Sequence, residues 1–417
     1  MRTPTKPMNQ LLLPILLATL AAVMPGSVHS QSTKSPVSIH SDFEGGRLGE
    51  ITHVADNQWQ CALLGESDSE DRNIQSSWYY FRVDGSKDKP MTIELTELVG
   101  EYNYRYGNVP LKPDTRPLVS YDQTHWQHLS DDEVRWNEAD TTLTMSFTPQ
   151  RDTVWVAHMV PYTTQPLEKL LAEYRTKPLV ALDTMGLTPE GRPLWLMTVA
   201  NPKVPLAQKK VVWLMARQHS WESGTSWIME GLIRYLLDSD RGRKLLDRTV
   251  FKLIPMGDPD GVARGGVRFN AFGHDLNRNW DYVIPEEMPE IQAQKQAMEE
   301  WLSQGNPMDL FVTLHNTNAD YIEGPETPVG RKLWKKAMER SLLDIEDGLR
   351  IMPASTTLGE PGRMTVFQAM WAEHQVPSYL IEFDVSRVEK LGRPRTLDDW
   401  LELGSMLAEV VVATVEK

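Results

Sequence analysis

The sequence has very little cysteine and no concentration of positive charge. Cys61 is the single cysteine among the 417 residues, so no intramolecular disulfide can form. The formal net charge is −14 and no basic run is long enough to offset it, which argues against nucleic acid or an anionic membrane surface as the main partner. No internal repeat or low-complexity tract is apparent. The fold must therefore be held by packing alone, and a composition that is 41% hydrophobic supplies enough material for two or three domains.

The N-terminal segment differs in character from the rest of the chain. Arg2 and Lys6 precede the apolar stretch LLLPILLATLAAVMPG, and small and polar residues follow it. A short basic start, an apolar stretch short for a membrane span and a loose small-residue cleavage site are typical of a secretory signal. An uncleaved anchor is the alternative, which Pro14 and Pro25 disfavour because proline interrupts a spanning helix. We therefore expect residues 1–30 to be a signal peptide and the protein to be exported, periplasmic or secreted, without stable membrane insertion.

Residues 31–160 have the pattern of a β-rich domain. The segments SSWYYFRVDG, MTIELTELVG, TTLTMSFTP and TVWVAHMVPY alternate polar with apolar residues and are separated by Gly, Pro and Asp. This pattern predicts an N-terminal antiparallel β-sandwich, in which most Trp and Tyr side chains belong to the core. His125 and His128 are interpreted as loop residues without a role.

In residues 161–417 predicted strands alternate with predicted helices. This order predicts an α/β/α domain with a mixed, mostly parallel central sheet. The expected strands are 191–201, 209–216, 249–255, 308–315 and 377–383, and the expected helices are 166–174, 226–240, 290–302, 331–345, 364–375 and a closing helix to 417.

Four ionisable side chains stand at or just past the ends of predicted strands. His219 and Glu222 follow one strand, His315 ends a second, and Glu382 lies near the end of a third. Singly, each has a plain structural explanation: a polar turn, a buried core histidine, a glutamate paired with an arginine. Ligands of open α/β sheets collect beyond the carboxyl ends of the strands, so we expect the four to converge if the strands are parallel neighbours.

Two imidazoles and one carboxylate occupy three positions of a tetrahedral zinc ion and leave the fourth for water. We therefore expect one Zn²⁺ per chain, held by His219, Glu222 and His315. Zinc lowers the pKa of bound water toward neutrality, and a further carboxylate must accept the proton and pass it to the leaving group. Glu382 is the candidate for this general base.

The kind of substrate is indicated by residues 254–281, IPMGDPDGVARGGVRFNAFGHDLNRNWD. This stretch is interpreted as an irregular Gly-rich loop, and it contains Arg264, Arg268, Asn277 and Arg278. Surface loops often carry arginines. Beside a zinc-bound hydroxide, however, a guanidinium with a neighbouring amide makes a clamp for a terminal carboxylate, and a second arginine can stabilise an oxyanion. Such a clamp would distinguish an exopeptidase from an endopeptidase.

These motifs resemble the M14 zinc carboxypeptidases, and specifically bacterial relatives of the cytosolic carboxypeptidases. The resemblance rests on GRPLW, ARQHSWESGTSW, DPDGVARGGVRFNAFGHDLNRNWD, LFVTLH and LIEFD, and on DFEGGRLG, WYYFRV, RPLVSYDQTHW and VPYTTQPLEKLL in the N-terminal region. It implies the same zinc ligands and general base. It further implies that Arg268 polarises the scissile carbonyl and that Asn277 and Arg278 bind the terminal carboxylate of a peptide or protein substrate.

The chain departs from the family pattern at several positions. Ser220 and Trp221 replace the common Pro-Gly between the first two ligands, and Asp258 replaces the usual asparagine before Pro-Asp-Gly, which we interpret as a turn variation. No tyrosine stands where digestive-type relatives have a catalytic one; Tyr321 and Tyr379 are poor substitutes by position, so none is assigned.

Three further residues are open to interpretation. Arg363 is either a surface arginine at a helix start or part of the pocket for the terminal side chain, where it would favour an acidic residue, as an arginine does in cytosolic carboxypeptidases. His274 lies within the Gly-rich loop and is a candidate to approach the site, and His374 is interpreted as a helix-end residue.

The sequence therefore predicts an exported zinc metallocarboxypeptidase that removes C-terminal residues from peptides or proteins. One alternative keeps the zinc site but acts on peptidoglycan stem peptides, as a carboxypeptidase or amidase. A deacylase of small N-acyl amino acids is disfavoured by the large β-domain and the carboxylate clamp. A peptide-binding protein that has lost catalysis is disfavoured by the intact set of His219, Glu222, His315 and Glu382. Side-chain preference, oligomeric state and the role of the β-domain cannot be read from the sequence.

Overall fold

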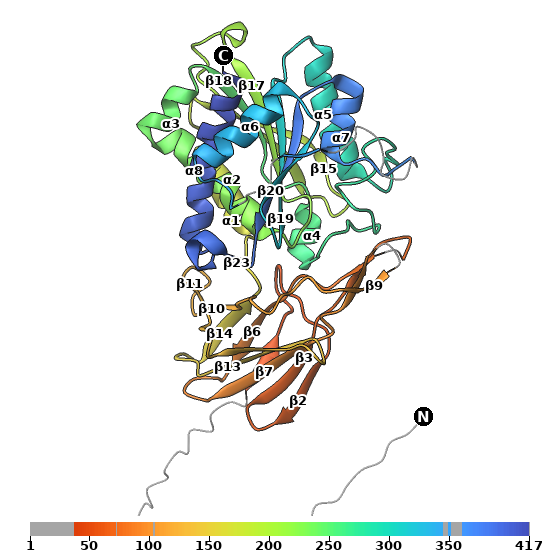
Figure 1. Ribbon diagram of the computed structural model, residues 1–417, viewed down its shortest axis with the longest axis vertical. Helices are drawn as coiled ribbons and strands as arrows, with labels where there is room; N and C mark the ends of the chain where they lie inside the picture. Colours follow the sequence, from red (N-terminus) through yellow and green to blue (C-terminus); the bar gives the residue numbers. More distant parts are fainter. Residues whose placement is uncertain (1–36, 72, 103–104, 345–348, 352–360, 417) are drawn as a thin grey trace, which may run out of the picture. The chain divides into compact units, whose positions relative to one another are not determined.

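The computed structural model describes residues 37–71, 73–102, 105–344, 349–351 and 361–416. The segment Val37–Lys417 forms one compact unit, shown in Figure 1. The predicted signal peptide, residues 1–30, lies outside the described residues.

The N-terminal part of this unit is built from three β-sheets. Two five-stranded sheets, in the orders β1-β6-β14-β10-β11 and β12-β13-β7-β3-β2, share one hydrophobic core, to which both contribute alternate side chains such as Phe81 and Ile93. This is the predicted β-sandwich; its pairs are antiparallel except for β3 and β7, which run parallel. A third sheet has the order β4-β5-β8-β9. The strands are β1 Ser38–His40, β2 Ile51–Ala55, β3 Gln58–Ala62, β4 Glu66–Ser67, β5 Asn73–Gln75, β6 Tyr80–Asp84, β7 Met91–Thr96, β8 Gly100–Tyr102, β9 Arg105–Asn108, β10 Leu118–Ser120, β11 Trp126–His128, β12 Val134–Asn137, β13 Thr142–Phe147 and β14 Thr153–Ala157.

One of the two histidines interpreted as loop residues belongs to a strand. His128 closes β11, and its ring nitrogens lie 2.9 Å from Arg116 O and 3.2 Å from Arg395 O. The short pairing of β11 with β10 was not visible as alternation because the strand has only three residues. His125 lies in a bend, as predicted.

The C-terminal part is an α/β domain around an eight-stranded mixed sheet. The strand order is β15-β16-β18-β17-β19-β22-β20-β21, and the four central strands β18, β17, β19 and β22 are parallel. The strands are β15 Val180–Leu187, β16 Pro193–Val199, β17 Lys210–Ala216, β18 Thr249–Ile254, β19 Leu310–Thr317, β20 Tyr321–Gly324, β21 Arg350–Ile351 and β22 Ser378–Asp384, and a separate two-stranded sheet pairs β23 Arg387–Val388 with β24 Arg393–Pro394. The helices are α1 Thr164–Tyr174, α2 Ser223–Asp238, α3 Asp240–Leu245, α4 Pro259–Arg264, α5 Pro289–Ser303, α6 Pro328–Glu339, α7 Val366–His374 and α8 Leu397–Val415, with 3₁₀ turns η1 Leu206–Gln208 and η2 Glu389–Leu391.

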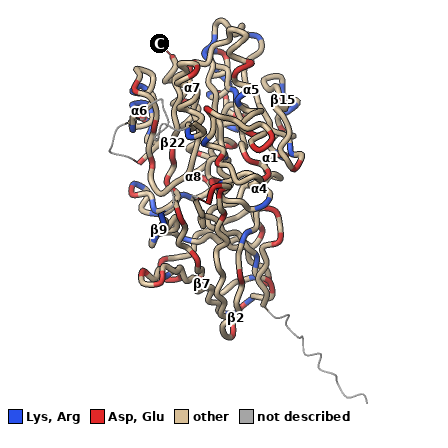
Figure 2. The backbone as a smooth tube through the Cα atoms, turned by 90° about the vertical axis from the view of Figure 1, so that its right-hand side faces the viewer, with Lys and Arg blue, Asp and Glu red and all other residues tan. Residues whose placement is uncertain are grey.

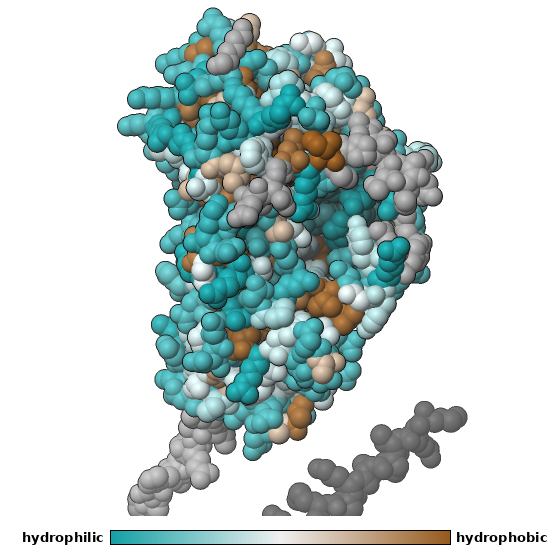
Figure 3. Space-filling view, viewed as in Figure 1, coloured by the Kyte–Doolittle hydropathy of each residue, from teal (hydrophilic) through white to brown (hydrophobic). Residues whose placement is uncertain are grey.

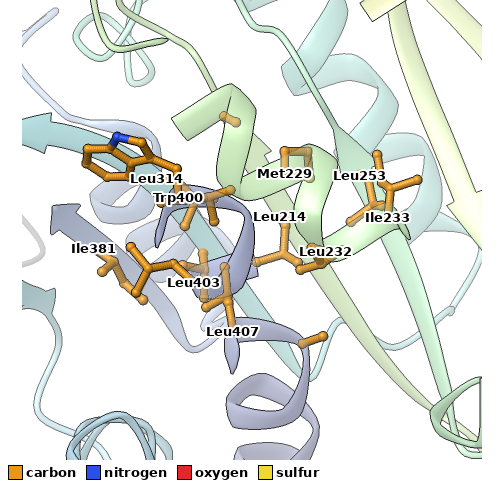
Figure 4. Packing of buried hydrophobic residues seen from close by; sticks show 14 of the residues in the cluster. Leu214, Met229, Leu232, Ile233, Leu253, Leu314, Ile381, Trp400, Leu403 and Leu407 are labelled. Atoms are coloured by element: carbon orange, nitrogen blue, oxygen red, sulfur yellow. The ribbon is translucent and has the colours of Figure 1, made fainter. Parts of the chain in front are cut away.

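Helices cover both faces of the large sheet (Figure 1). Alternate residues of a strand point to opposite faces, so Leu214 of β17 packs with α2 and α8, whereas Trp213 packs with α5 and α7. Figure 4 shows part of the first packing layer, in which Leu214 lies among side chains of α2 and α8. The helices α2 and α8 approach each other so closely that a Cβ atom at Gly231 would lie 2.1 Å from Leu401 O. Glycine at this position therefore sets the thickness of the layer.

The structure also corrects three predicted elements. Residues 254–281 are not wholly irregular, because Asp258 caps the short helix α4 through a 2.8 Å hydrogen bond from Gly261 N to Oδ1. The predicted helix 226–240 is split at Ser239, which caps α3. The helix predicted at 331–345 begins earlier, at Pro328, and ends at Glu339.

Among the described residues, none of the helices combines the length and apolar composition needed to cross a bilayer. Acidic and basic residues are interspersed among uncharged ones in Figure 2, and the face shown in Figure 3 is mostly hydrophilic, with small separate hydrophobic patches.

Candidate metal centre

The order of the central strands brings the predicted ligands to one edge of the sheet. β17, β19 and β22 are adjacent and parallel, so their carboxyl ends lie together. His219 stands three residues beyond β17, while His315 in β19 is directly paired with Glu382 in β22. Both His315 and Glu382 occupy strand positions on the α5–α7 face, because the adjacent Leu314, Ile381 and Phe383 contribute to the core beneath α2 and α8.

The turn after β17 is shaped by a buried arginine. Arg217 has left-handed backbone geometry, with φ of 59°, and the residue is 2% exposed. It donates hydrogen bonds to Ser220 O at 2.9 Å, to Tyr162 O at 3.1 Å and to Ser226 Oγ at 3.1 Å. The turn then ends at Glu222, which is the N-terminal flanking residue of α2. A left-handed residue costs conformational energy, and the three hydrogen bonds offset that cost while fixing the turn.

The three predicted ligands converge on a small buried volume. Glu222 Oε1 lies 2.7 Å from His219 Nδ1, and Glu222 Oε2 lies 2.9 Å from His315 Nδ1. The ligand atoms of the three residues all lie within 4.8 Å of one another, and all three side chains are buried. Both imidazoles therefore direct the same nitrogen, Nδ1, toward the carboxylate.

Each imidazole also has an outer partner on its second nitrogen. His219 Nε2 lies 2.9 Å from Asp275 Oδ1. His315 Nε2 lies 3.2 Å from Gln218 Oε1 and 3.2 Å from Thr313 Oγ1, both of which can accept its hydrogen. Partners on the far nitrogen fix the ring orientation and tautomer of metal-ligating histidines. Gln218 and Asp275 were not identified from the sequence, although both stand within the motifs that carry the family resemblance.

The donor set fits zinc. Two imidazole nitrogens and a carboxylate are ligands that Zn²⁺ accepts together in sites that keep an open position. Glu222 Oε2 is buried and lies 2.9 Å from His315 Nδ1 without hydrogen-bond geometry, so its lone pairs are available to a cation. Burial alone would raise the pKa of Glu222, but the imidazoles of His219 and His315 lower it to about 2. The carboxylate is thus ionised, as a metal ligand must be.

Glu382 lies in the same buried region without being needed as a ligand. Its Oε2 is buried and makes no hydrogen bond among the described residues. Burial raises the pKa of Glu382 well above its ordinary value, and the nearby carboxylate of Glu222 raises it further, while Arg268 acts in the opposite direction. A bound divalent cation would add positive charge and favour the ionised form. The protonation state of this carboxyl group therefore depends on its charged neighbours, as expected of a group that exchanges protons.

A tyrosine lies beside the general-base candidate. The hydroxyl of Tyr321 in β20 donates to Glu382 Oε1 at 3.5 Å, because β20 pairs with β22 and places Tyr321 opposite Glu382. Tyr321 therefore lies beside Glu382, a position that the sequence did not reveal. The pairing of β20 antiparallel to β22 could not be read from sequence spacing. Tyr379, by contrast, points away and bonds to Thr327 Oγ1 at 2.7 Å.

The predicted substrate-binding residues line one cleft of about 390 Å³ together with the predicted metal ligands. Arg268 is oriented by a 2.8 Å hydrogen bond from its Nε to Asp275 Oδ2. Asn277 is buried and uses Oδ1 to accept from Val366 N at 3.1 Å, while its Nδ2 faces His315. An amide nitrogen has two hydrogens, so one remains for a ligand. The cleft also includes Arg278 and Arg363, and the structure thus brings every predicted site residue together.

The N-terminal β-domain contributes part of the cleft wall, which the sequence did not reveal. Tyr102 of β8 lies beside the guanidinium groups of Arg278 and Arg268. Burial alone would raise the pKa of Tyr102, but these two positive charges lower it. Lys112 lines the same cleft. His274, by contrast, lies outside this cleft and makes a 2.8 Å contact from Nε2 to Glu287.

Two family profiles match the chain in succession. The profile described as the cytosolic carboxypeptidase N-terminal domain matches residues 39–159, and the profile described as zinc carboxypeptidase matches residues 165–322. The matched regions follow one another in the order of the β-sandwich and the α/β domain.

Curated relatives are 27–31% identical to this chain over the aligned residues. Cytosolic carboxypeptidase 2 of Mus musculus is 31% identical over 295 residues, which is 66% of this chain and 34% of the mouse protein. Cytosolic carboxypeptidase 3 of Mus musculus is 27% identical over 293 residues, 66% of this chain and 28% of that protein. An uncharacterized protein of Zymomonas mobilis is 28% identical over 283 residues, 67% of this chain and 68% of its own length. The chain thus spans about a third of the length of the mouse proteins.

Solved structures share the fold. A metallo-carboxypeptidase from Burkholderia cenocepacia superposes with a TM-score of 0.77 at 22% identity, covering 91% of this chain and 99% of that one. A metallo-carboxypeptidase from Pseudomonas aeruginosa, in complex with (2-guanidinoethylmercapto)succinic acid, gives a TM-score of 0.74 at 22% identity, covering 90% of this chain and 98% of that one. Since the two family profiles together match more than half of its residues, in the same order as its two folded parts, the chain belongs to the M14 zinc carboxypeptidase family.

Proposed function

We propose that the protein is a zinc-dependent metallocarboxypeptidase that hydrolyses C-terminal residues from peptides or proteins. The observation that carries the proposal is the cleft itself, which holds a His-Glu-His ligand set, a buried glutamate and an arginine-asparagine pair. His219, Glu222 and His315 would hold one zinc ion. When bound, zinc would lower the pKa of a coordinated water and polarise the carbonyl of the scissile bond.

The residues of the chain supply the remaining steps. Glu382 accepts a proton from the attacking water and delivers it to the nitrogen of the departing residue. Arg268, held by Asp275, donates hydrogen bonds to the oxyanion that develops on the scissile carbonyl. Arg278 and the free Nδ2 hydrogen of Asn277 bind the terminal carboxylate of the substrate. Each of these groups lines the same cleft, which supports the division of roles.

The pocket for the terminal side chain lies beside this carboxylate site. Arg363 and Gln368 line the cleft near Arg278, together with the apolar side chains of Phe367 and Leu380. A guanidinium at this position favours a terminal residue with an acidic side chain. We therefore propose a preference for C-terminal glutamate or aspartate over apolar residues.

The proposal is tested with pairs of peptides that differ only at the C-terminus. The zinc-loaded protein should cleave a peptide with a free carboxylate and leave its amidated twin intact, because the amide cannot form the ion pair with Arg278. Equal cleavage of both members would refute the exopeptidase assignment. A peptide library with all terminal residues then measures the side-chain preference.

Export to the bacterial cell envelope remains our proposal for the location, and the signal-peptide pattern of residues 1–30 supports it. Fractionation of cells that express the full chain, followed by N-terminal sequencing, tests it. A mature protein that begins near residue 31 in the periplasm is the expected result, and an intact N-terminus in the cytoplasm would contradict it.

A further inference from the structure

An acidic side chain of the N-terminal domain holds the loop that carries Arg268. Glu66, in β4, accepts three successive backbone hydrogen bonds on one oxygen, Oε2: from Val267 N at 2.9 Å, from Arg268 N at 2.5 Å and from Phe269 N at 2.9 Å. Successive N–H groups that point at one anion form a nest, and hydrogen bonds to an ionised acceptor are about twice as strong as neutral ones. The backbone of this loop is therefore fixed from another domain.

The sequence of the loop fits this contact. Gly265 has φ of 67°, and a side chain there would lie 2.3 Å from Gly46 O of the N-terminal domain. A side chain at Gly266 would lie 2.9 Å from Ser220 Oγ and 3.1 Å from Glu66 Oε1. The two glycines thus allow the loop to pass close to both domains.

Further hydrogen bonds close the same junction. Arg47 donates from Nε to Leu64 O at 2.7 Å and from its terminal nitrogens to Gly65 O at 3.2 Å and Gly265 O at 3.3 Å. On the other side of the loop, Trp221 N donates to Val267 O at 3.0 Å, which ties the loop to the turn between the first two metal ligands. The loop therefore lies between Glu66 and the metal centre.

The geometry points to a role for the N-terminal domain in the reaction itself: we propose that Glu66 is a positioning residue that sets where Arg268 presents its guanidinium. The side chain of Arg268 is aimed by Asp275, and its backbone is placed by Glu66, so loss of either constraint moves the hydrogen-bond donors. This inference rests on the proposed function, because the consequence of the misplacement is read through peptide hydrolysis. A hydrogen-bond donor to the oxyanion must be in place before the negative charge develops, so a small displacement of that donor lowers the rate of hydrolysis strongly.

The kinetic test is a double-mutant cycle of Glu66→Ala and Arg268→Ala. Alone, Glu66→Ala should lower kcat by about 10- to 100-fold and leave KM within about threefold, since the lost interaction acts in the transition state. In the Arg268→Ala background the same change should lower kcat by less than about threefold, because no guanidinium remains to be positioned. Losses that multiply in full in the double variant would assign Glu66 to general stability and overturn the proposal.

Two comparison variants control for folding. Glu66→Gln keeps an oxygen acceptor of the same shape without the charge, so its kcat should lie between those of the wild type and Glu66→Ala. Asp132→Ala removes an exposed carboxylate from the same domain and should leave kcat unchanged. All variants should bind one zinc per chain, measured by elemental analysis. Loss of zinc from the glutamine variant would show that Glu66 acts on the whole site and would overturn the specific role.

A second readout does not depend on activity. In the zinc-loaded wild type, amide hydrogen exchange at residues 267–269 should be slow, and in Glu66→Ala it should be at least about tenfold faster while β17 keeps its protection. Unchanged exchange at 267–269 would overturn the contact itself. If the wild type cleaves no peptide but this exchange pattern is found, the proposed function fails and the positioning contact stands.

Discussion

Replacing Asp258 by asparagine should remove a pH-dependent loss of stability. The side chain is fully buried; Oδ1 accepts the capping hydrogen bond from Gly261 N, and Oδ2 has no hydrogen-bond partner among the described residues. The pKa of Asp258 is raised from 3.8 to about 8, chiefly by burial. The hydrogen bond from Gly261 N lowers this pKa, whereas the nearby carboxyl group of Glu290 raises it. The folded protein therefore keeps this carboxyl protonated at neutral pH, while the unfolded chain ionises it.

The sign and the size of the effect follow from proton binding. Between pH 4 and pH 8 the unfolded chain has lost a proton that the folded chain retains, so the free energy of unfolding falls as the pH rises. At about 1.4 kcal/mol per pH unit, the loss between pH 5 and pH 8 is at most about 4 kcal/mol. Asparagine has no proton to lose, and its amide oxygen can accept the same bond from Gly261. The Asp258→Asn protein should match the wild type near pH 4 and exceed its stability increasingly above pH 5.

The assay is urea unfolding at pH 5, 6, 7 and 8, followed by the fluorescence of the 14 tryptophans. Zinc is saturating in both proteins, because the metal ligands titrate too and their contribution then cancels in the difference. Asp399→Asn is the opposite control. Burial alone would raise the pKa of Asp399, but Arg393 and the capping box at Thr396 lower it to about 2. Loss of this carboxylate should therefore lower the free energy of unfolding at neutral pH, and the difference from the wild type should shrink as the pH falls below 4. Parallel pH profiles for the wild type and Asp258→Asn would refute the reasoning.

Three further changes probe the cleft directly. Glu382→Gln should keep one zinc per chain and lose at least about three orders of magnitude in kcat, measured on a free-acid peptide; near-normal hydrolysis would remove Glu382 from the mechanism. Arg278→Ala should raise KM about 10- to 100-fold for free-acid peptides, as expected for a lost charged hydrogen-bond pair, and an unchanged KM would place the carboxylate elsewhere. Tyr321→Phe should shift the acidic limb of the kcat/KM profile to higher pH by less than about one unit, because the hydroxyl lowers the pKa of Glu382, and a shift to lower pH would contradict this hydrogen bond.

The elements that form the metal centre could be predicted because they depend on local pattern. Each parallel strand is a short apolar run, and the polar residue that follows it marks the sheet edge. This was enough to group His219, His315 and Glu382 before any pairing was known. The helix α4 was missed although its signal is local: Asp258 followed by Pro259 is a capping residue followed by proline in the first turn.

The remaining features depend on pairings that separate the residues widely in sequence. Tyr321 reaches Glu382 only because β20 runs antiparallel to β22, and Glu66 reaches Arg268 across 202 positions of the chain. Nothing in the spacing of these residues encodes the contact. A short strand such as β11, which has three residues, likewise carries too little alternation to be recognised.

The direct pairing of His315 with Glu382 restricts how the gene can change. Side-chain direction alternates with every residue of a strand, so an insertion or deletion of a single codon within β22 would turn Glu382 toward the hydrophobic layer beneath α2 and α8. Such a frame-preserving indel would bury a carboxyl group in that hydrophobic layer and remove it from the position opposite His315. Natural variation in this strand should therefore consist of substitutions, with length changes confined to the segments outside it.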